Sequence, residues 1–160
     1  MSKKILITGF TGQVGSQLVD YLLDHTDFDL FGMMRWQEPL NNIYHLTERI
    51  NKKDRLYIKY ADLTDFPSLM SVISNVLPDF IFHLAAQSFP RTSFDIPIET
   101  LQTNIIGTAN ILEAIRQIDR YDPVVHVCSS SEVYGRASSG VTLSEDTPMH
   151  GASPYSISKI

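Results

Sequence analysis

The sequence contains a single cysteine, Cys128, so no disulfide can form within the chain. A lone thiol is typical of the reducing cytoplasm rather than of a secreted, disulfide-stabilised domain. The sequence also lacks an apolar run near the ~20 residues of a membrane span. Its N-terminal apolar run is shorter than the ~7–15 residues at the centre of a signal peptide. These absences predict a cytoplasmic protein that has no membrane partner.

Positive charge is scarce as well, because 13 Lys and Arg residues stand against 18 Asp and Glu residues. An acidic chain has no long-range field to attract nucleic acid, so any anionic ligand must be held by local groups. The content of 43% hydrophobic and 19% charged residues is ordinary for a globular protein, and 160 residues can bury a core. We expect residues 1–160 to form one domain with no nucleic-acid partner.

Short apolar runs alternate with amphipathic segments along the whole chain. The runs that predict strands are 4–8, 28–34, 55–60, 80–84 and 124–128. The segments that predict helices are 13–25, 40–50, 65–77 and 99–118, followed by one that Ser153 caps and Pro154 opens. This alternation predicts an α/β fold, a doubly wound parallel sheet of the Rossmann class. We expect the last helix to be truncated and the chain to be a fragment whose C-terminal substrate domain is missing.

Three evenly spaced glycines, Gly9, Gly12 and Gly15, follow the first predicted strand and open the first predicted helix. A dinucleotide site needs one glycine for a tight turn, one where the backbone touches pyrophosphate, and one where helix packs on strand. The pyrophosphate then lies at the helix N-terminus, where N–H groups are free. The alternative is an ordinary turn that contains glycines. The other residues predicted to contact the cofactor here are Thr11, Gln13 and Val14.

The choice of dinucleotide depends on the end of the second predicted strand. NAD enzymes usually carry a carboxylate there, whereas an arginine accommodates a 2′-phosphate. Arg35 directly follows the strand here, next to Trp36, which favours NADP over NAD. The alternative is that Arg35 is a solvated surface residue. After the third strand, Asp62 and Leu63 are predicted to contact the adenine, although Asp62 could also cap the next helix.

Tyr155 and Lys159 stand four residues apart at the start of the last predicted helix, and so share one face. Phenols ionise near pH ~10, and a neighbouring ammonium group favours the phenolate. Tyr155 could then remove a hydroxyl proton while hydride leaves the same carbon. The alternative is an exposed helical pair. The fifth predicted strand ends in a run of serines, one of which could bond the reacting oxygen.

Five segments carry a resemblance to a known family: 8–15, 83–86, 103–108, 129–135 and 155–159. Together they resemble the extended short-chain dehydrogenases of nucleotide-sugar metabolism, and most of all the N-terminal part of the GDP-mannose 4,6-dehydratases. The resemblance implies that Ser130, Glu132, Tyr155 and Lys159 are catalytic. It also implies that Leu84, Ala85 and Ala86 contact the cofactor, along with Tyr155 and Lys159, and that Ser88, Ser130 and Glu132 contact the substrate.

The same resemblance implies a cycle in which the sugar is oxidised at C4, loses water across C5 and C6, and takes the hydride back at C6. Tyr155 would act as the base at C4, with Ser130 bonding the C4 oxygen, and Glu132 would remove the C5 proton. We expect Glu132, Tyr155 and Lys159 to converge at the open edge of the sheet. A full-length homodimer or homotetramer is implied through the helices from Glu99 and Ser153, and 1–160 alone should bind cofactor weakly and catalyse nothing.

Several alternatives stay open at this level. A GDP-4-keto-6-deoxymannose reductase, or a UDP-sugar epimerase or decarboxylase of the same family, would share much of this site. A dinucleotide-sensing protein without turnover, or an interaction fragment, would share the fold alone. No metal site is predicted, because His83 and His126 have no third ligand at a suitable spacing and are expected to be core residues. Cys128 is likewise expected in the core, and Met33 and Met34 in packing.

Overall fold

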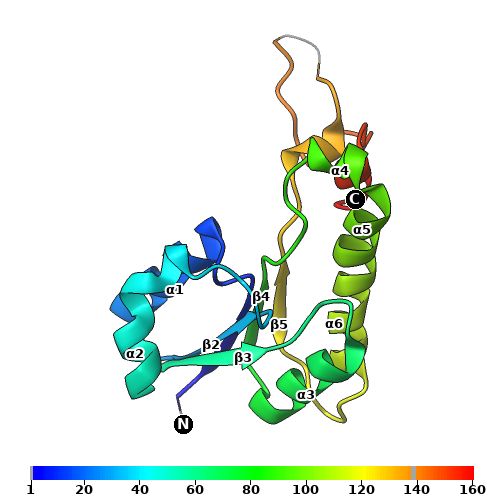
Figure 1. Ribbon diagram of the computed structural model, residues 1–160. Coiled ribbons are helices and arrows are strands. Elements are labelled where there is room, and N and C mark those ends of the chain that lie inside the picture. Colours follow the sequence, from blue (N-terminus) through cyan, green and yellow to red (C-terminus); the bar gives the residue numbers. More distant parts are fainter. Residues whose placement is uncertain (1, 138–139) are drawn as a thin grey trace.

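The computed structural model describes residues 2–137 and 140–160, which form a parallel sheet between two layers of helices (Figure 1). The sheet has five strands in the order β3-β2-β1-β4-β5. The strands are β1 (Lys4–Thr8), β2 (Asp29–Met34), β3 (Leu56–Tyr60), β4 (Phe80–His83) and β5 (Val124–Val127). The direction of strand order changes between β1 and β4, and this is where open α/β sheets bind ligands. The predicted doubly wound fold is confirmed.

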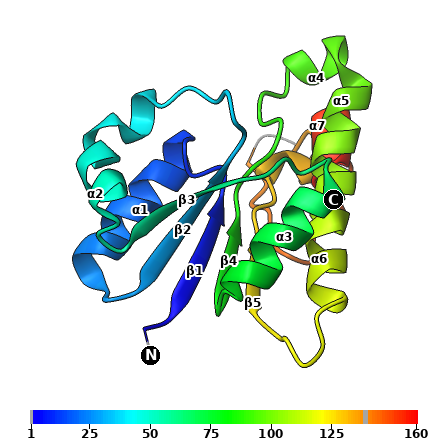
Figure 2. The same cartoon turned by 60° about the horizontal axis from the view of Figure 1, so that its bottom comes forward.

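The helices alternate with the strands and cover both faces of the sheet. They are α1 (Gln13–His25), η1 (Asn41–Leu46), α2 (Thr47–Lys52), α3 (Phe66–Val76), α4 (Thr92–Asp95), α5 (Pro97–Leu101), η2 (Gln102–Ile106), α6 (Gly107–Arg116), η3 (Ser131–Tyr134) and α7 (Pro154–Ile157). Figure 2 shows α1 and α2 on one side of the sheet and α3 and α6 on the other. In the described part of the chain, no helix combines the length and the apolar character needed to cross a bilayer.

Strand alternation explains why the sheet has two separate cores. In β1, Ile5 and Ile7 face one side and pack with Val19 of α1. Leu6 faces the other side and packs with Ile73 of α3 and Ile111 of α6. Because successive side chains of a strand point to opposite faces, a continuous apolar run such as β1 is needed to supply both cores.

Several predicted helices differ in detail from the observed ones. The segment predicted as one helix at 40–50 is a 3-10 turn, η1, that continues into α2. The long helix predicted at 99–118 starts earlier, at Pro97, and contains a π-helical turn, η2, between α5 and α6. The short α4 was not predicted. Asp65 stands at the N-cap position of α3, but its side chain accepts no capping hydrogen bond.

The expectation that β5 is a buried strand is wrong. Val124 and Val127 are 63% and 45% exposed, and His126 is exposed too. The reason is position: β5 is an edge strand that pairs with β4 alone among the described residues. Of the two histidines expected in the core, His83 is buried there and His126 is not. Cys128 is half-buried and follows the end of the strand.

Candidate active site

The glycine turn between β1 and α1 leaves no room for a side chain at Gly9 or Gly15. Gly9 has a φ of +68°, and a Cβ on it would lie 2.8 Å from the backbone N and Cα of Ala85. A Cβ on Gly15 would lie 2.6 Å from the Cα of Phe10, and one on Gly12 would lie 3.1 Å from the Gly9 carbonyl oxygen. The turn therefore requires glycine at Gly9 and Gly15, and leaves bare backbone at Gly12, the N-cap of α1.

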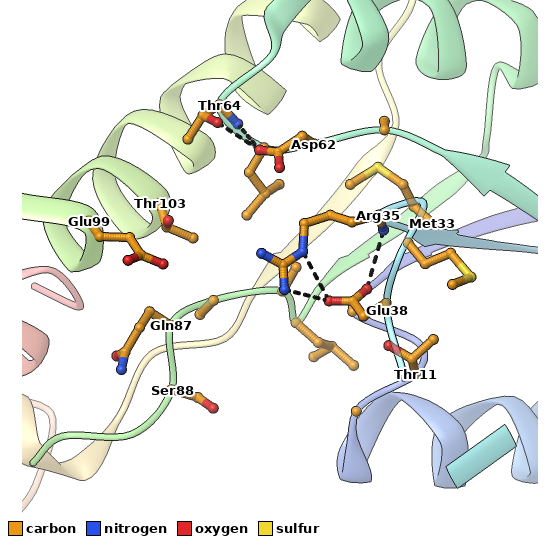
Figure 3. A pocket seen from close by; sticks show the side chains of 18 of the residues that line it. Thr11, Met33, Arg35, Glu38, Asp62, Thr64, Gln87, Ser88, Glu99 and Thr103 are labelled. Atoms are coloured by element: carbon orange, nitrogen blue, oxygen red, sulfur yellow. Dashed lines mark hydrogen bonds and ion pairs between the residues drawn. The ribbon is translucent and has the colours of Figure 1, made fainter. Parts of the chain in front are cut away.

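A cavity of about 430 Å³ opens directly beside this turn, at the carboxyl ends of the central strands (Figure 3). The helix α1 points its N-terminus at the same edge, where the N–H groups of its first turn have no helical partner. Most residues predicted to bind cofactor line the cavity. They are Gly9, Thr11, Gly12, Arg35, Asp62, Leu63, Leu84, Ala85 and Ala86, and Ser88 of the predicted substrate set lies with them.

One end of the cavity carries charge. Arg35 donates to Glu38 from Nε at 3.2 Å and from Nη2 at 3.0 Å, both to Oε1 (Figure 3). Asp62 accepts from the backbone N–H of Thr64 at 2.8 Å and from its hydroxyl at 2.7 Å. Burial raises the pKa of Asp62, but the Thr64 hydrogen bonds and the nearby charge of Arg35 outweigh it, so the pKa lies below its usual value. Arg35 is thus an ion-paired pocket residue.

Two aromatic residues lie close to this end of the site in the chain but do not line the cavity. Trp36 is 75% exposed and meets the ring of Tyr60 edge-on, with 5.0 Å between ring centroids. Met33 and Met34 are buried, as expected of packing residues, and also line the cavity. The prediction of Asp62 as a helix cap is not met, because its carboxylate bonds Thr64 and the N-cap position of α3 belongs to Asp65.

A buried hydrogen-bond chain lies beneath the glycine turn. The Thr8 hydroxyl accepts from the Ala85 backbone N–H at 3.1 Å, and it lies 2.8 Å from Nδ1 of His83. Nε2 of His83 lies 3.0 Å from the hydroxyl of Thr108, which donates to the carbonyl of Asn104 at 2.6 Å. Burial and the charge of Lys159 lower the pKa of His83 to about 4. The imidazole is therefore neutral at physiological pH and links β1, β4 and α6.

The helix α7 carries Tyr155 but ends at Ile157, so Lys159 lies in the turn that follows it. The prediction that Tyr155 and Lys159 share one face of a helix is therefore wrong, because the helix is only four residues long. Its start is fixed by a capping box, in which Ser153 Oγ accepts from Ser156 N at 3.0 Å and Ser156 Oγ accepts from Ser153 N at 2.8 Å. Lys159 Nζ donates to the Cys128 carbonyl at 3.1 Å, which joins the turn after α7 to the end of β5. Burial lowers the pKa of the Lys159 ammonium. Tyr155 is itself buried.

Ser130 directly precedes the short helix η3 and Glu132 lies within it. This helix packs against α7. Ser130 is the N-cap of η3, and its hydroxyl accepts from the Glu132 backbone N–H at 3.2 Å. The Glu132 side chain is exposed. Within residues 2–137 and 140–160, no hydrogen bond joins the side chains of Glu132, Tyr155 and Lys159. Their convergence over one substrate stays a prediction.

Several predicted site residues do not line the main cavity. Gln13, Val14 and Gly15 lie next to the main cavity in the chain but do not line it. Lys159 lines a second cavity of about 280 Å³, with Asn104 and Ser129. Neither cavity is lined by Tyr155, Ser130 or Glu132.

Sequence reasoning missed several residues that line the main cavity. These are Glu38, Ala61, Thr64, Gln87, Glu99, Gln102 and Thr103. Glu38 stands three residues after Arg35, a spacing that could have suggested an ion pair. For Gln87 the signal was weaker: its backbone N–H donates to Asn104 Oδ1 at 2.8 Å, and only the fold brings these residues together.

The chain is similar to a known family, to proteins of established function and to solved structures. The family model described as GDP-mannose 4,6 dehydratase matches residues 6–160. The chain is 37% identical to GDP-mannose 4,6 dehydratase of Drosophila melanogaster, over 99% of this chain and 41% of that protein. It superposes with a TM-score of 0.79 on dTDP-glucose 4,6-dehydratase from Bacillus anthracis in complex with NAD, at 27% identity over 99% of this chain and 47% of that one.

A third comparison concerns the cofactor. The structure of RMD from Pseudomonas aeruginosa complexed with NADPH superposes with a TM-score of 0.72, at 28% identity over 99% of this chain and 46% of that one. The chain thus spans less than half the length of these similar proteins. Similar folds are found with either dinucleotide.

Proposed function

Because the chain belongs to the GDP-mannose 4,6-dehydratase family, we propose that its gene product is a nucleotide-sugar 4,6-dehydratase that uses NADP. Its substrate is a GDP-hexose, with GDP-mannose first, and its product is the GDP-4-keto-6-deoxy sugar. One observation carries the proposal: the hydrogen bond from Lys159 Nζ to the Cys128 carbonyl joins the turn after α7 to the end of β5, at the sheet edge that also bears the glycine turn.

The residues of the main cavity fit a dinucleotide. Gly12 has no side chain, so a ligand can approach its backbone closely. The N–H groups at the start of α1 suit a pyrophosphate. Arg35 suits a 2′-phosphate, because its guanidinium can donate two parallel hydrogen bonds to an oxyanion. A dinucleotide held by these residues would supply a nicotinamide for reversible hydride transfer.

The chain's own residues supply the proton transfers. Tyr155 removes the proton of the C4 hydroxyl while the Lys159 ammonium favours the phenolate and Ser130 bonds the same oxygen. The resulting C4 ketone acidifies the C5 proton, which Glu132 takes and passes to the departing C6 hydroxyl, so that water leaves. When the hydride is returned to C6, the proton held by Tyr155 is returned to C5. Glu132 is exposed at η3, so a substrate can reach it without displacing the core.

The product distinguishes the proposal from its rivals. Full-length protein incubated with GDP-mannose and NADP should give a product that has lost one water, with no net change in cofactor oxidation state. Glu132→Gln should bind GDP-mannose normally and form no dehydrated product. An epimerised, reduced or decarboxylated product would assign one of the related activities instead, and no product with any nucleotide sugar would favour a sensing protein.

We also propose that the full-length protein is a cytoplasmic homodimer or homotetramer. Exposed apolar side chains along α5, η2 and α6 support a helical interface: Ile98, Ile105, Ile106 and Leu112. Light scattering on the full-length protein and its Ile105→Glu variant tests the assembly, and fractionation tests the compartment. Residues 1–160 on their own should bind dinucleotide weakly and show no turnover, because similar proteins are more than twice as long.

A further inference from the structure

The Arg35–Glu38 pair is more constrained than an ordinary surface ion pair. Besides the two hydrogen bonds from the guanidinium, Glu38 Oε2 accepts from the backbone N–H of Arg35 at 3.2 Å. The Glu38 side chain is 21% exposed, against 64% for that of Arg35. The carboxylate is therefore held from two directions at the end of β2, beside the turn that carries Thr11 (Figure 3).

The charges around Arg35 are unbalanced. Among the described residues that line the main cavity, Arg35 is the only cation, whereas Glu38, Asp62 and Glu99 are carboxylates. Arg35 is close enough to Asp62 to contribute to the lowered pKa of that carboxyl, after burial and the Thr64 hydrogen bonds. The negative charges of Glu38 and Asp62 partly neutralise the guanidinium, so its electrostatic attraction for a phosphate is weaker than that of an unpaired arginine.

From this geometry we infer that Glu38 is a specificity-determining residue, which restrains the preference for NADP by holding the guanidinium that a 2′-phosphate needs. The inference rests on the proposed NADP site. A 2′-phosphate must draw Arg35 away from Glu38 and then lies near that carboxylate, which repels it. A 2′,3′-diol carries no charge, and a carboxylate accepts hydrogen bonds from hydroxyls, so NAD meets no such opposition.

The test is the binding of each dinucleotide to full-length protein by titration calorimetry. Glu38→Gln keeps the size of the side chain and removes its charge, and it should tighten NADP binding by about three- to tenfold while changing NAD binding by less than about twofold. The gain should shrink in high salt, because the opposing charges are near the surface. Glu99→Gln removes a carboxylate that bonds no arginine, and is the matched control.

The outcomes separate the inference from the proposed site. If Arg35→Met weakens NADP but not NAD, the proposed site stands, and an unchanged affinity ratio in Glu38→Gln then overturns the role of Glu38. If Arg35→Met leaves NADP binding unchanged, the proposed NADP site itself fails. An equal gain in Glu99→Gln would show a general charge effect and also overturn the inference. Glu38→Ala also removes the charge and should shift the affinity ratio in the same direction. Thermal unfolding of every variant checks that the substitutions leave the protein folded.

Discussion

The hydroxyl of Thr8 donates a hydrogen bond to Nδ1 of His83 across 2.8 Å, and this contact joins the adjacent strands β1 and β4. The direction follows from the neighbours. The Thr8 oxygen already accepts from Ala85 N–H, and Thr108 already donates to the Asn104 carbonyl. Because the single Thr108 proton is already used, Nε2 of the neutral imidazole must donate to Thr108. Nδ1 then carries no proton and must accept from the Thr8 hydroxyl. The network holds a neutral imidazole with its proton on Nε2.

This network predicts a loss of stability in mild acid. The pKa of His83 falls from 6.5 to about 4 on folding, so the unfolded chain binds more protons between these values. The stabilisation is complete above pH ~6.5 and is lost as the pH falls toward ~4, by up to ~3 kcal/mol. Urea unfolding measured between pH 7.5 and 4.5 should show this slope.

The control is His83→Gln, which has no group that titrates in this range. Its stability is expected to be lower at neutral pH, because the Thr8 and Thr108 partners are imperfectly replaced. Its decline between pH 6.5 and 4.5 should nevertheless be shallower than that of the wild type. Parallel curves for the two proteins would show that another group causes the acid sensitivity.

The glycine turn predicts two different phenotypes for two alanines. Gly15→Ala places a methyl against the Phe10 backbone, which cannot move aside, and should cost ~1–3 kcal/mol of stability. Gly12→Ala meets the Gly9 oxygen at 3.1 Å, a contact that a small shift relieves. It should leave stability within ~1 kcal/mol but weaken dinucleotide binding at least about tenfold, because the methyl covers the pyrophosphate position.

Urea unfolding and calorimetric titration with NADP on full-length protein check both variants. Normal dinucleotide affinity in a folded Gly12→Ala protein would mean that the pyrophosphate does not approach this turn. Undiminished stability in Gly15→Ala would mean that the contact between α1 and the turn at Gly9 and Phe10 is looser than described.

The hydrogen bonds of Asn104 predict a loss of folding stability when this side chain is removed. Its side chain accepts from Gln87 N at 2.8 Å and donates to the Gln87 carbonyl at 3.1 Å and to Ser158 Oγ at 2.8 Å. Asn104→Ala leaves these partners unpaired, and should cost ~1–3 kcal/mol by urea unfolding. Asn104→Asp keeps the acceptor but loses the donors, and should fall between wild type and alanine at pH 8. Equal stability of all three would exclude the bridge.

The sequence was most informative where one short segment determines its own structure. The apolar run of β1 and the glycine spacing identified a strand, a turn and a helix whose contacts are mostly local. The edge exposure of β5 could not be read from its apolar residues, because exposure depends on which strands pair beside it. Val14 and Tyr21 of α1 are apolar as well but 64% and 58% exposed, because they do not lie on the face of the helix that packs on the sheet.

In the candidate site, too, single residues can be recognised from the sequence, whereas their pairings depend on the fold. The sequence indicates Arg35 because it directly follows a strand, but the pairing of Arg35 with Glu38 depends on how the chain turns after β2. The link between Asn104 and Gln87 joins segments that are far apart in sequence, and the π-helical turn η2 carries one of its partners. A π turn has no compositional signature of its own, so neither feature was visible before the fold was known.

The capping box at Ser153 gives a prediction about catalysis. The helix α7 is only four residues long, so its backbone is fixed largely by Ser153 and Ser156 rather than by helical propensity. Ser153→Ala removes the acceptor for Ser156 N–H and should cost ~0.5–2 kcal/mol. Because α7 carries Tyr155, kcat with GDP-mannose should fall further than dinucleotide affinity, which depends mainly on the glycine turn.

Two further variants make this test specific. Ser153→Asp keeps a capping oxygen and should recover most of the stability and of kcat. Ser144→Ala removes an exposed hydroxyl that caps no helix, and should behave as wild type. If Ser153→Ala lost stability but kept its full kcat, the position of Tyr155 would not depend on the cap. The proposed role of α7 in presenting the phenol would then have to rest on the Lys159–Cys128 bond instead.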